Sequence, residues 1–123
     1  MLCRVLVRVG WRIMSRMIGR LWRGRCTPEN AEAYETLLLT EIIPELDKAE
    51  GCLGAYVMRR QDGEDIEFAV LHLLESLAAV KAFAGDNYQA AVVPGEARAL
   101  LASFDPVVQH FEVRAAPDRG RIS

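Results

Sequence analysis

Apolar residues recur at helical spacing along residues 27–46. The stripe consists of Tyr34, Leu38, Ile42 and Leu46, with Ala31 and Leu37 beside it. Positions three and four apart lie on one face of an α-helix, so the pattern predicts an amphipathic helix. Thr27 is a suitable N-cap, and Pro28 suits the first helical position. Pro44 is expected to kink or end this helix near Ile43, because proline has no backbone N–H and its ring clashes with the preceding turn.

A second helix is predicted to begin after Ser76, whose hydroxyl can cap it. Its inward residues would be Leu77, Val80, Phe83 and Ala84, and Gly85 stands just past its end. Two shorter helical segments are expected at 86–93 and 96–103, because Pro94 separates them.

Four strands are predicted between and around these helices, at 17–25, 53–60, 65–74 and 107–113. The Asp62-Gly63 pair between the second and third strands is a strong hairpin signal. The resulting order, β-α-β-β-α-β, is the ferredoxin-like arrangement of an α+β domain. Right-handed crossovers put the first strand in the centre, flanked by the third and fourth.

The third predicted strand is apolar on both of its faces, as Phe68–Leu74 shows. A strand with one wet face should alternate, so both faces of this one are expected to be buried. The two main helices can cover only one face of the sheet. A second copy of the same sheet is therefore expected to cover the other, and the chain is predicted to be a homodimer. Cover from the 86–103 segment is the alternative.

Alternation along the strands also predicts which polar residues share a face. The set opposite the helices is expected to carry Arg20, Trp22, Tyr56, His72, His110 and Glu112 among apolar neighbours. Apolar walls with a few polar groups are typical of a small-molecule site. The phase of each strand is assumed, and a slip of one residue would remove that strand's side chains from the set.

Charge is distributed unevenly along the 123 residues, which suit one domain. Seven of the 15 basic residues are arginines within residues 1–25, before the first acid, Glu29. The rest of the chain holds eight basic residues against 17 acidic ones. An acidic body argues against nucleic acid as the main partner, because phosphate binding needs a basic face. The longest apolar runs are far below the ~18 residues of a membrane helix, so no stable membrane insertion is expected.

The domain itself is expected to span residues 17–114, followed by a loose polar tail at 115–123. Residues 1–16 form a basic extension. Three interpretations stay open. The extension is a disordered or artefactual addition with Met14 or Met17 as the true start, or a basic arm that contacts lipid or nucleic acid, or a targeting peptide.

The three cysteines are Cys3, Cys26 and Cys52. An odd number without a CxxC spacing argues against a disulfide framework or a zinc site, and favours a reducing cytoplasm. Cys26 and Cys52 are interpreted as small buried hydrophobes, because no histidine is near them in sequence. The histidines that could bind a metal are His72 and His110, and their spacing predicts no metal-binding cluster.

Three stretches resemble the antibiotic biosynthesis monooxygenase family: Met17–Arg25, Leu71–Gly85 and Val108–Val113. Their order and spacing together carry the resemblance, which covers nearly all of residues 17–114. It implies a homodimer whose two sheets face each other in a dimeric α+β barrel. It also implies a pocket between the sheet and the helices.

The resemblance implies varied chemistry. Some members oxygenate polyketide-type phenols or quinols without metal or flavin, some degrade haem, and many have no established activity. The haem-degrading branch is the least similar: Leu74 stands at the position of its tryptophan, and no histidine lies between Lys81 and Ala91. No cofactor is therefore expected.

Two residues are the candidates for catalysis. His72 could remove a phenolic proton, or could be a hydrogen-bonded core histidine. Arg20 could stabilise the resulting anion, or could pair with Glu112 across the sheet. The candidates for contact with a substrate are Trp22, Tyr56, His110 and Leu74.

The family resemblance, taken with these residues, implies two alternative functions, and the resemblance alone supplies the reaction of the first. The first is a cofactor-independent monooxygenase acting on a small aromatic or polyketide-like compound, with the substrate anion reacting directly with oxygen. The second is a non-catalytic homodimer of the same fold that binds a small ligand.

Overall fold

The computed structural model describes residues 11–13 and 16–117. Its main sheet contains β2 (Ile18–Cys26), β3 (Cys52–Asp62), β4 (Asp65–Leu74), β5 (Ser103–Phe104) and β6 (Gln109–Glu112). The strand order is β3-β4-β2, and β5 and β6 both pair with the far edge of β2. All pairs are antiparallel. The predicted ferredoxin-like α+β fold is confirmed, with the first long strand in the centre.

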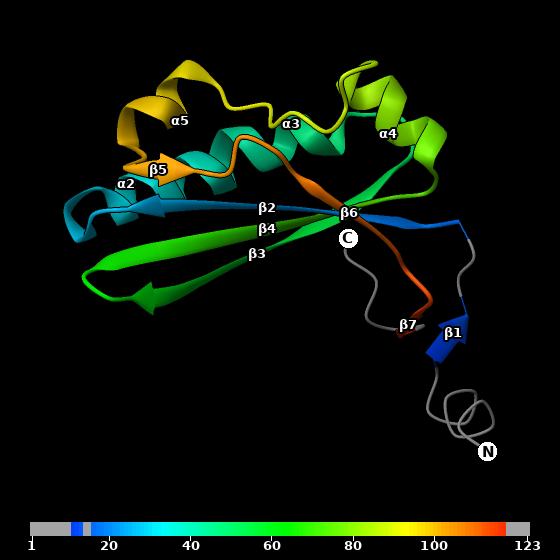
Figure 1. The fold of residues 1–123 in the computed structure, drawn as a ribbon, viewed down its shortest axis with the longest axis horizontal. Coiled ribbons are helices and arrows are strands. Elements are labelled where there is room, and N and C mark those ends of the chain that lie inside the picture. The colour runs from blue at the N-terminus through cyan, green and yellow to red at the C-terminus, as the bar shows by residue number, and fades with distance from the viewer. Residues whose placement is uncertain (1–10, 14–15, 118–123) are drawn as a thin grey trace.

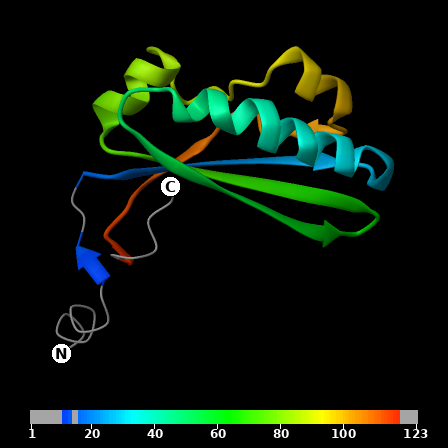
Figure 2. The same ribbon diagram turned by 180° about the vertical axis from the view of Figure 1, so that it is seen from behind.

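The helices all lie on one side of the main sheet (Figure 1), and the view from behind shows the same arrangement (Figure 2). They are α2 (Pro28–Leu37), the π-helical turn η1 (Leu38–Ile42), α3 (Ile43–Asp47), α4 (Leu77–Ala84) and α5 (Gly95–Leu100). None of the helices in the described part of the chain has the length and apolarity needed to cross a membrane. The opposite face of the main sheet is left open by these helices.

Pro44 changes the hydrogen bonding of the first helix without ending it. The backbone N–H of Ile43 donates to the carbonyl of Leu38, five residues earlier, in place of the usual partner four residues earlier. A π turn widens the helix where the proline ring would otherwise meet the preceding turn. The expected end near Ile43 is therefore wrong, because the chain stays helical to Asp47.

The predicted helix at 86–93 is also wrong, since this segment forms turns and an isolated bridge between Ala90 and Val107. Its backbone bonds to the chain before β6: Ala91 donates to the carbonyl of Pro106 at 2.9 Å, and Val108 donates to that of Gln89 at 2.8 Å. These long-range bonds occupy groups that a helix would need. The helix predicted at 96–103 is α5, and it ends at Leu100.

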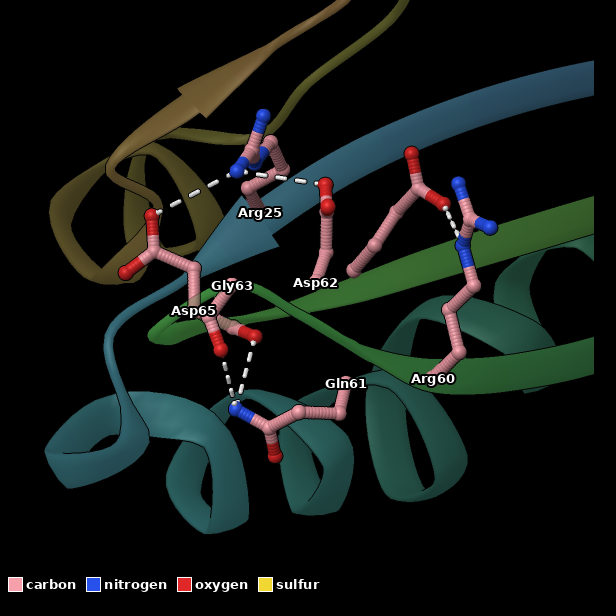
Figure 3. A network of polar contacts seen from close by, with 7 residues as sticks. Arg25, Arg60, Gln61, Asp62, Gly63 and Asp65 are labelled. Atoms are coloured by element: carbon pink, nitrogen blue, oxygen red, sulfur yellow. Dashed lines mark hydrogen bonds and ion pairs between the residues drawn. The ribbon is translucent and has the colours of Figure 1, made fainter.

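The hairpin between β3 and β4 turns at Gly63-Glu64, because Asp62 and Asp65 are paired. Gly63 has a φ of 63°, and no described non-glycine residue has a positive φ. A positive φ at the first turn position alone is the signature of a type II′ turn. Figure 3 shows Arg25 reaching from β2 to this hairpin, 3.1 Å from Asp62 and 3.9 Å from Asp65.

Two short strands lie apart from the main sheet. β1 (Trp11–Ile13) pairs antiparallel with β7 (Ala115–Pro117). The sequence pattern predicted no strand in either segment. The pairing places the two ends of the described chain side by side, away from the helices (Figure 1).

The core lies between the helices and the even-numbered face of β4. Burial along β4 alternates strictly, with Ile66, Phe68, Val70, His72 and Leu74 buried. Tyr34 of α2 meets Phe68 edge-on, with ring centroids 5.0 Å apart. Ser76 accepts a hydrogen bond from the backbone N–H of Ala79 at 3.1 Å, so the predicted cap of α4 is confirmed.

Candidate functional site

Three polar side chains form a row across the centre of the sheet. His72 on β4 is paired with Arg20 on β2, and Arg20 is paired with His110 on β6. Directly paired residues project to the same face, so the predicted grouping of these three is correct. Arg20 and His72 are only 5% and 3% exposed.

The face assigned to this row was wrong. It was expected opposite the helices, but the row lies beneath them, on the same side of β4 as Phe68 and Val70. Alternation states which side chains share a face, and it does not state which face the helices cover. On β4 both parities are apolar, so the pattern held no signal to decide.

A cavity of about 80 Å³ lies between this row and the helices, in agreement with the pocket that the family resemblance implied. Its lining includes the charged side chain of Arg20 and the titratable side chains of His72 and Tyr34. Its walls include Trp22, Tyr34, Leu38, Ile42, Phe83 and Val93. The inward stripe predicted for the first helix therefore forms one wall of the cavity.

A wider chamber of about 350 Å³ adjoins the cavity and shares Ile42, Leu46, Phe83, Val92 and Pro94 with it. Exposed carboxylates of Glu41, Glu45 and Glu96 stand at its rim. A benzene-sized ligand needs a cavity of roughly 150 Å³. An aromatic compound would therefore have to extend from the wider chamber into the inner cavity.

The guanidinium of Arg20 holds the loop that follows α4. Nη1 donates to the carbonyl of Tyr88 and lies 2.9 Å from Nε2 of His110, and Nη2 donates to the carbonyl of Ala90 at 3.2 Å. Arginine has five N–H donors. Two donors therefore remain for another acceptor.

The charge of Arg20 has no counter-ion within the part of the chain that the structure describes. Among the residues that the structure describes, no carboxylate lies within ion-pair distance of it. Burial lowers the pKa of Arg20 from its ordinary value, because the charged form has lost water. Phe83 lies under the guanidinium at 5.6 Å and compensates part of that loss.

His72 is neutral at physiological pH. Its burial and then the positive charge of Arg20 lower its pKa to about 4, against a smaller opposing effect of Asp47. The imidazole meets the ring of Phe83 edge-on, with centroids 5.1 Å apart. A neutral imidazole has one lone pair and one N–H, so it can accept or donate a proton toward the cavity.

His110 is held by Arg20. Because arginine only donates, Nε2 of His110 must be the acceptor and the proton must lie on Nδ1. Burial, followed by the charge of Arg20, lowers the pKa of His110 as well. Its ring meets Tyr88 edge-on at 5.3 Å. His110 therefore positions Arg20.

Trp22 forms a wall of the cavity next to Arg20. Its indole N–H donates to the carbonyl of Asp105 at 3.1 Å, which fixes the plane of the ring. The nitrogen is thereby satisfied by the backbone, and the ring offers a flat apolar surface to a ligand.

Three residues of the expected set lie elsewhere. Tyr56 is paired with Leu71 and projects to the open face of the sheet, where it is 43% exposed. Leu74 shares the face of His72 but packs with Val80 in the core under α4. Glu112 forms an exposed ion pair with Arg114 at 3.4 Å, so the alternative in which Arg20 pairs with Glu112 is wrong.

Cys52 is a neighbour of the site that sequence reasoning missed. Its Sγ lies 3.1 Å from Nε2 of His72, although the two residues are 20 positions apart. Counting back from the Asp-Gly turn would have placed residue 55 opposite residue 72, as observed. An irregularity between Cys52 and Gly54 then brings the thiol to the imidazole. The register of the hairpin was therefore the signal that could have revealed this contact, because the two residues are not close in sequence.

No group of three or more His, Cys, Asp or Glu side chains that could hold a metal ion occurs within residues 11–13 and 16–117. The polar groups that the lining residues bring to the cavity include the guanidinium of Arg20, the imidazole of His72 and the phenol of Tyr34, and they suit an organic ligand that carries an acidic hydroxyl.

Comparison with solved structures places the fold among known proteins. A protein from Caulobacter crescentus, provisionally described as an antibiotic biosynthesis monooxygenase, is 22% identical, with a TM-score of 0.58 over 81% of this chain and 92% of its own. A protein from Shewanella oneidensis is 19% identical, with a TM-score of 0.60 over 85% and 97%. A conserved protein from Methanosarcina mazei is 15% identical, with a TM-score of 0.57 over 81% and 95%. These likenesses establish the fold.

No curated protein matches the chain. The family model described as antibiotic biosynthesis monooxygenase matches residues 17–95, which is more than half of the chain. That match includes the strand that carries Arg20 and Trp22, the helix that roofs the cavity, and the strand that carries His72. The chain belongs to the antibiotic biosynthesis monooxygenase family.

Proposed function

We propose that the protein is a monooxygenase that needs no metal or flavin and acts on a small aromatic or polyketide-like phenol. The observation that carries this proposal is the buried charge of Arg20, which lines an apolar cavity and has no carboxylate partner among the described residues. A buried cation without a counter-ion is unfavourable, and an anion formed in the cavity would supply the missing charge. Family membership supports the reaction type.

The reaction begins with loss of the phenolic proton, and His72 is the proposed base. The two free N–H groups of Arg20 receive the phenolate oxygen, and Trp22 packs against the ring. Such preorganised donors act strongly where water is excluded. The anion then reacts with dioxygen. A phenol C–H becomes a quinone C=O, the substrate supplies the four electrons, and the second oxygen atom leaves as water.

The proton does not remain on His72. A positive charge at contact distance lowers the pKa of a phenol from ~10 by about 1 to 3 units. The bound phenol is still a weaker acid than the imidazolium of His72, whose pKa is about 4. Deprotonation is therefore favourable only if oxygen consumes the anion or the proton passes onward.

The test measures oxygen uptake and product mass with purified protein and a panel of hydroxylated anthracyclic phenols. His72→Gln and Arg20→Gln are expected to lower turnover by about 10²- to 10³-fold, the usual effect of removing a general base or an oxyanion donor. Arg23→Gln is the matched control, because Arg23 lies on the same strand but the other face and bonds Gln109. No turnover, or equal turnover in all variants, would contradict the proposal.

The alternative is a non-catalytic small-ligand-binding homodimer of the same fold. It is favoured by the three contacts that commit Arg20 to the loop and to His110. Thermal stabilisation by a phenol, without oxygen consumption, would support this alternative.

The proposed partner in solution is a second copy of the chain, seated on the open face of the sheet. Met58 and Phe111 are 46% and 51% exposed there, and Leu71, Leu73 and Val113 surround Gly19. An apolar sheet face of this kind is unusual on a monomer. Met58→Glu with Phe111→Glu is expected to halve the mass measured by light scattering. A wild-type mass of one chain would contradict the dimer. A cytoplasmic location fits the free thiols of Cys26 and Cys52.

A further inference from the structure

The thiol of Cys52 stands between the buried imidazole of His72 and the exposed carboxylate of Asp47. Its Sγ is 3.1 Å from Nε2 of His72 and 3.8 Å from Oδ1 of Asp47. Cys52 is the first residue of β3, and Asp47 is the last residue of α3. A continuous path of polar atoms therefore leads from the cavity lining to the surface.

Counting hydrogen-bond donors and acceptors gives the direction of each bond along this path. Burial raises the pKa of the Cys52 thiol, so it carries its single proton near neutral pH. A carboxylate can only accept, and the contact with Asp47 therefore uses the thiol proton. The sulfur must then accept from Nε2–H of His72. In this arrangement Nδ1 of His72 has no proton and is free to act as a base.

We propose that Cys52 and Asp47 form a proton relay that holds His72 in its Nε2–H tautomer and carries the substrate proton to solvent. The transfer is balanced at each atom: the phenolic proton moves to Nδ1 of His72, the Nε2 proton moves to Sγ, and the thiol proton moves to Asp47 and then to water. Cys52 and Asp47 are positioning residues, since neither lines the cavity. The relay rests on the proposed function, in which His72 is the base.

The charges around His72 explain why a relay is needed. Arg20 approaches from β2 and opposes an imidazolium, and Asp47 at the end of α3 favours one. From α4 the ring of Phe83 contributes no charge. His110 on β6 interacts with His72 only through Arg20. An imidazolium beside a desolvated guanidinium is unfavourable, and among the described residues the charge that favours it is that of Asp47, beyond Cys52.

The first test needs no substrate. Nitrogen-15 NMR of the full-length protein reports which ring nitrogen of His72 is protonated. The Nε2–H form is expected in the wild type and in Cys52→Ser, which keeps one donor and one acceptor. Cys52→Ala is expected to shift the tautomer ratio by about 2- to 10-fold, the worth of one hydrogen bond. A wild-type Nδ1–H tautomer, or an unchanged ratio in Cys52→Ala, would overturn the relay.

The second test uses a phenol that is turned over. Cys52→Ala and Asp47→Asn are expected to lower kcat by about 10-fold or more with KM unchanged, because the relay acts on a proton and not on binding. Glu50→Gln is the control, since it removes an exposed carboxylate close to Asp47 in sequence. Wild-type kcat in both variants would overturn the transfer step. If no phenol is turned over, the proposed function fails, and the NMR result still decides the hydrogen-bond arrangement.

Discussion

Replacement of Arg20 by glutamine should abolish the ability of the cavity to ionise a phenol. The guanidinium is 5% exposed and has no carboxylate partner among the described residues. Its charge is therefore available to a bound anion. Two unit charges about 4 Å apart interact by about 4 kcal/mol when the effective dielectric constant is near 20. This energy sets an upper limit of about 3 units on the lowering of the phenol pKa, and shifts of 1 to 3 units are the usual range.

The assay is an absorbance titration of a bound phenol whose colour changes on ionisation. In the wild type the pKa of the bound phenol is expected about 1 to 3 units below its value in water. In Arg20→Gln it is expected at or above the value in water, because the apolar cavity then disfavours the anion. Arg20→Lys keeps the charge but loses the planar fork, so part of the shift is expected to remain.

Stability must be controlled in this experiment. Arg20 makes two hydrogen bonds to loop carbonyls and one contact with His110, so Arg20→Gln is expected to destabilise the fold by about 2 to 4 kcal/mol. Thermal melts identify the temperature at which both proteins are folded. The reasoning is refuted if the wild type leaves the pKa of the phenol unchanged, or if Arg23→Gln abolishes the shift as Arg20→Gln does.

Three further predictions concern stability. His72 has a pKa of about 4 in the folded protein against an ordinary 6.5, so the unfolded chain binds more protons between these two pH values. The free energy of unfolding therefore falls by up to about 3 kcal/mol as the pH drops from 6.5 to 4. Urea titrations at the two pH values should show a smaller loss of this free energy in His72→Gln. Ser76→Ala removes the cap of α4 and should lower the free energy of unfolding by about 1 kcal/mol, measured in the same titrations at pH 7. Gly24→Ala would put a methyl group 2.4 Å from Cη2 of Trp22, so a loss of about 1 to 3 kcal/mol and altered tryptophan fluorescence are expected. Gly95→Ala meets no atom within 4 Å and should cause neither a loss of stability nor a change of fluorescence.

Local patterns predicted most of the elements. The strand at 65–74, the Asp-Gly turn and the cap at Ser76 each depend on residues close together in the chain. The same reasoning wrongly predicted a helix at 86–93, because long-range hydrogen bonds determine the structure of this segment despite its helical composition. In that segment the carbonyls of Tyr88 and Ala90 accept from Arg20. The N–H of Ala91 donates to Pro106 and the carbonyl of Gln89 accepts from Val108, and no local pattern records these bonds.

The candidate site divides in the same way. Strand periodicity determined that Arg20 shares a face with Trp22, because side chains alternate strictly along a pleated strand. That His72 shares this face was an assumption about strand phase, and the pairing of Arg20 with His72 agrees with it. The same kind of assumption misplaced Tyr56, whose strand is paired in the opposite phase. Cys52 was interpreted as a buried hydrophobe, and the contact with His72 appears only when the hairpin folds.

The sequence by itself determined the order of strands and helices, the family resemblance and the grouping of most of the polar residues. These properties depend on neighbours along the chain. Only the tertiary structure decided which face of the sheet the helices cover, and so whether Arg20 lies in a closed cavity or beneath a partner. That choice depends on how bulky residues such as Phe68 pack against a helix more than 30 positions away, and both faces of the strand were apolar enough to accept it.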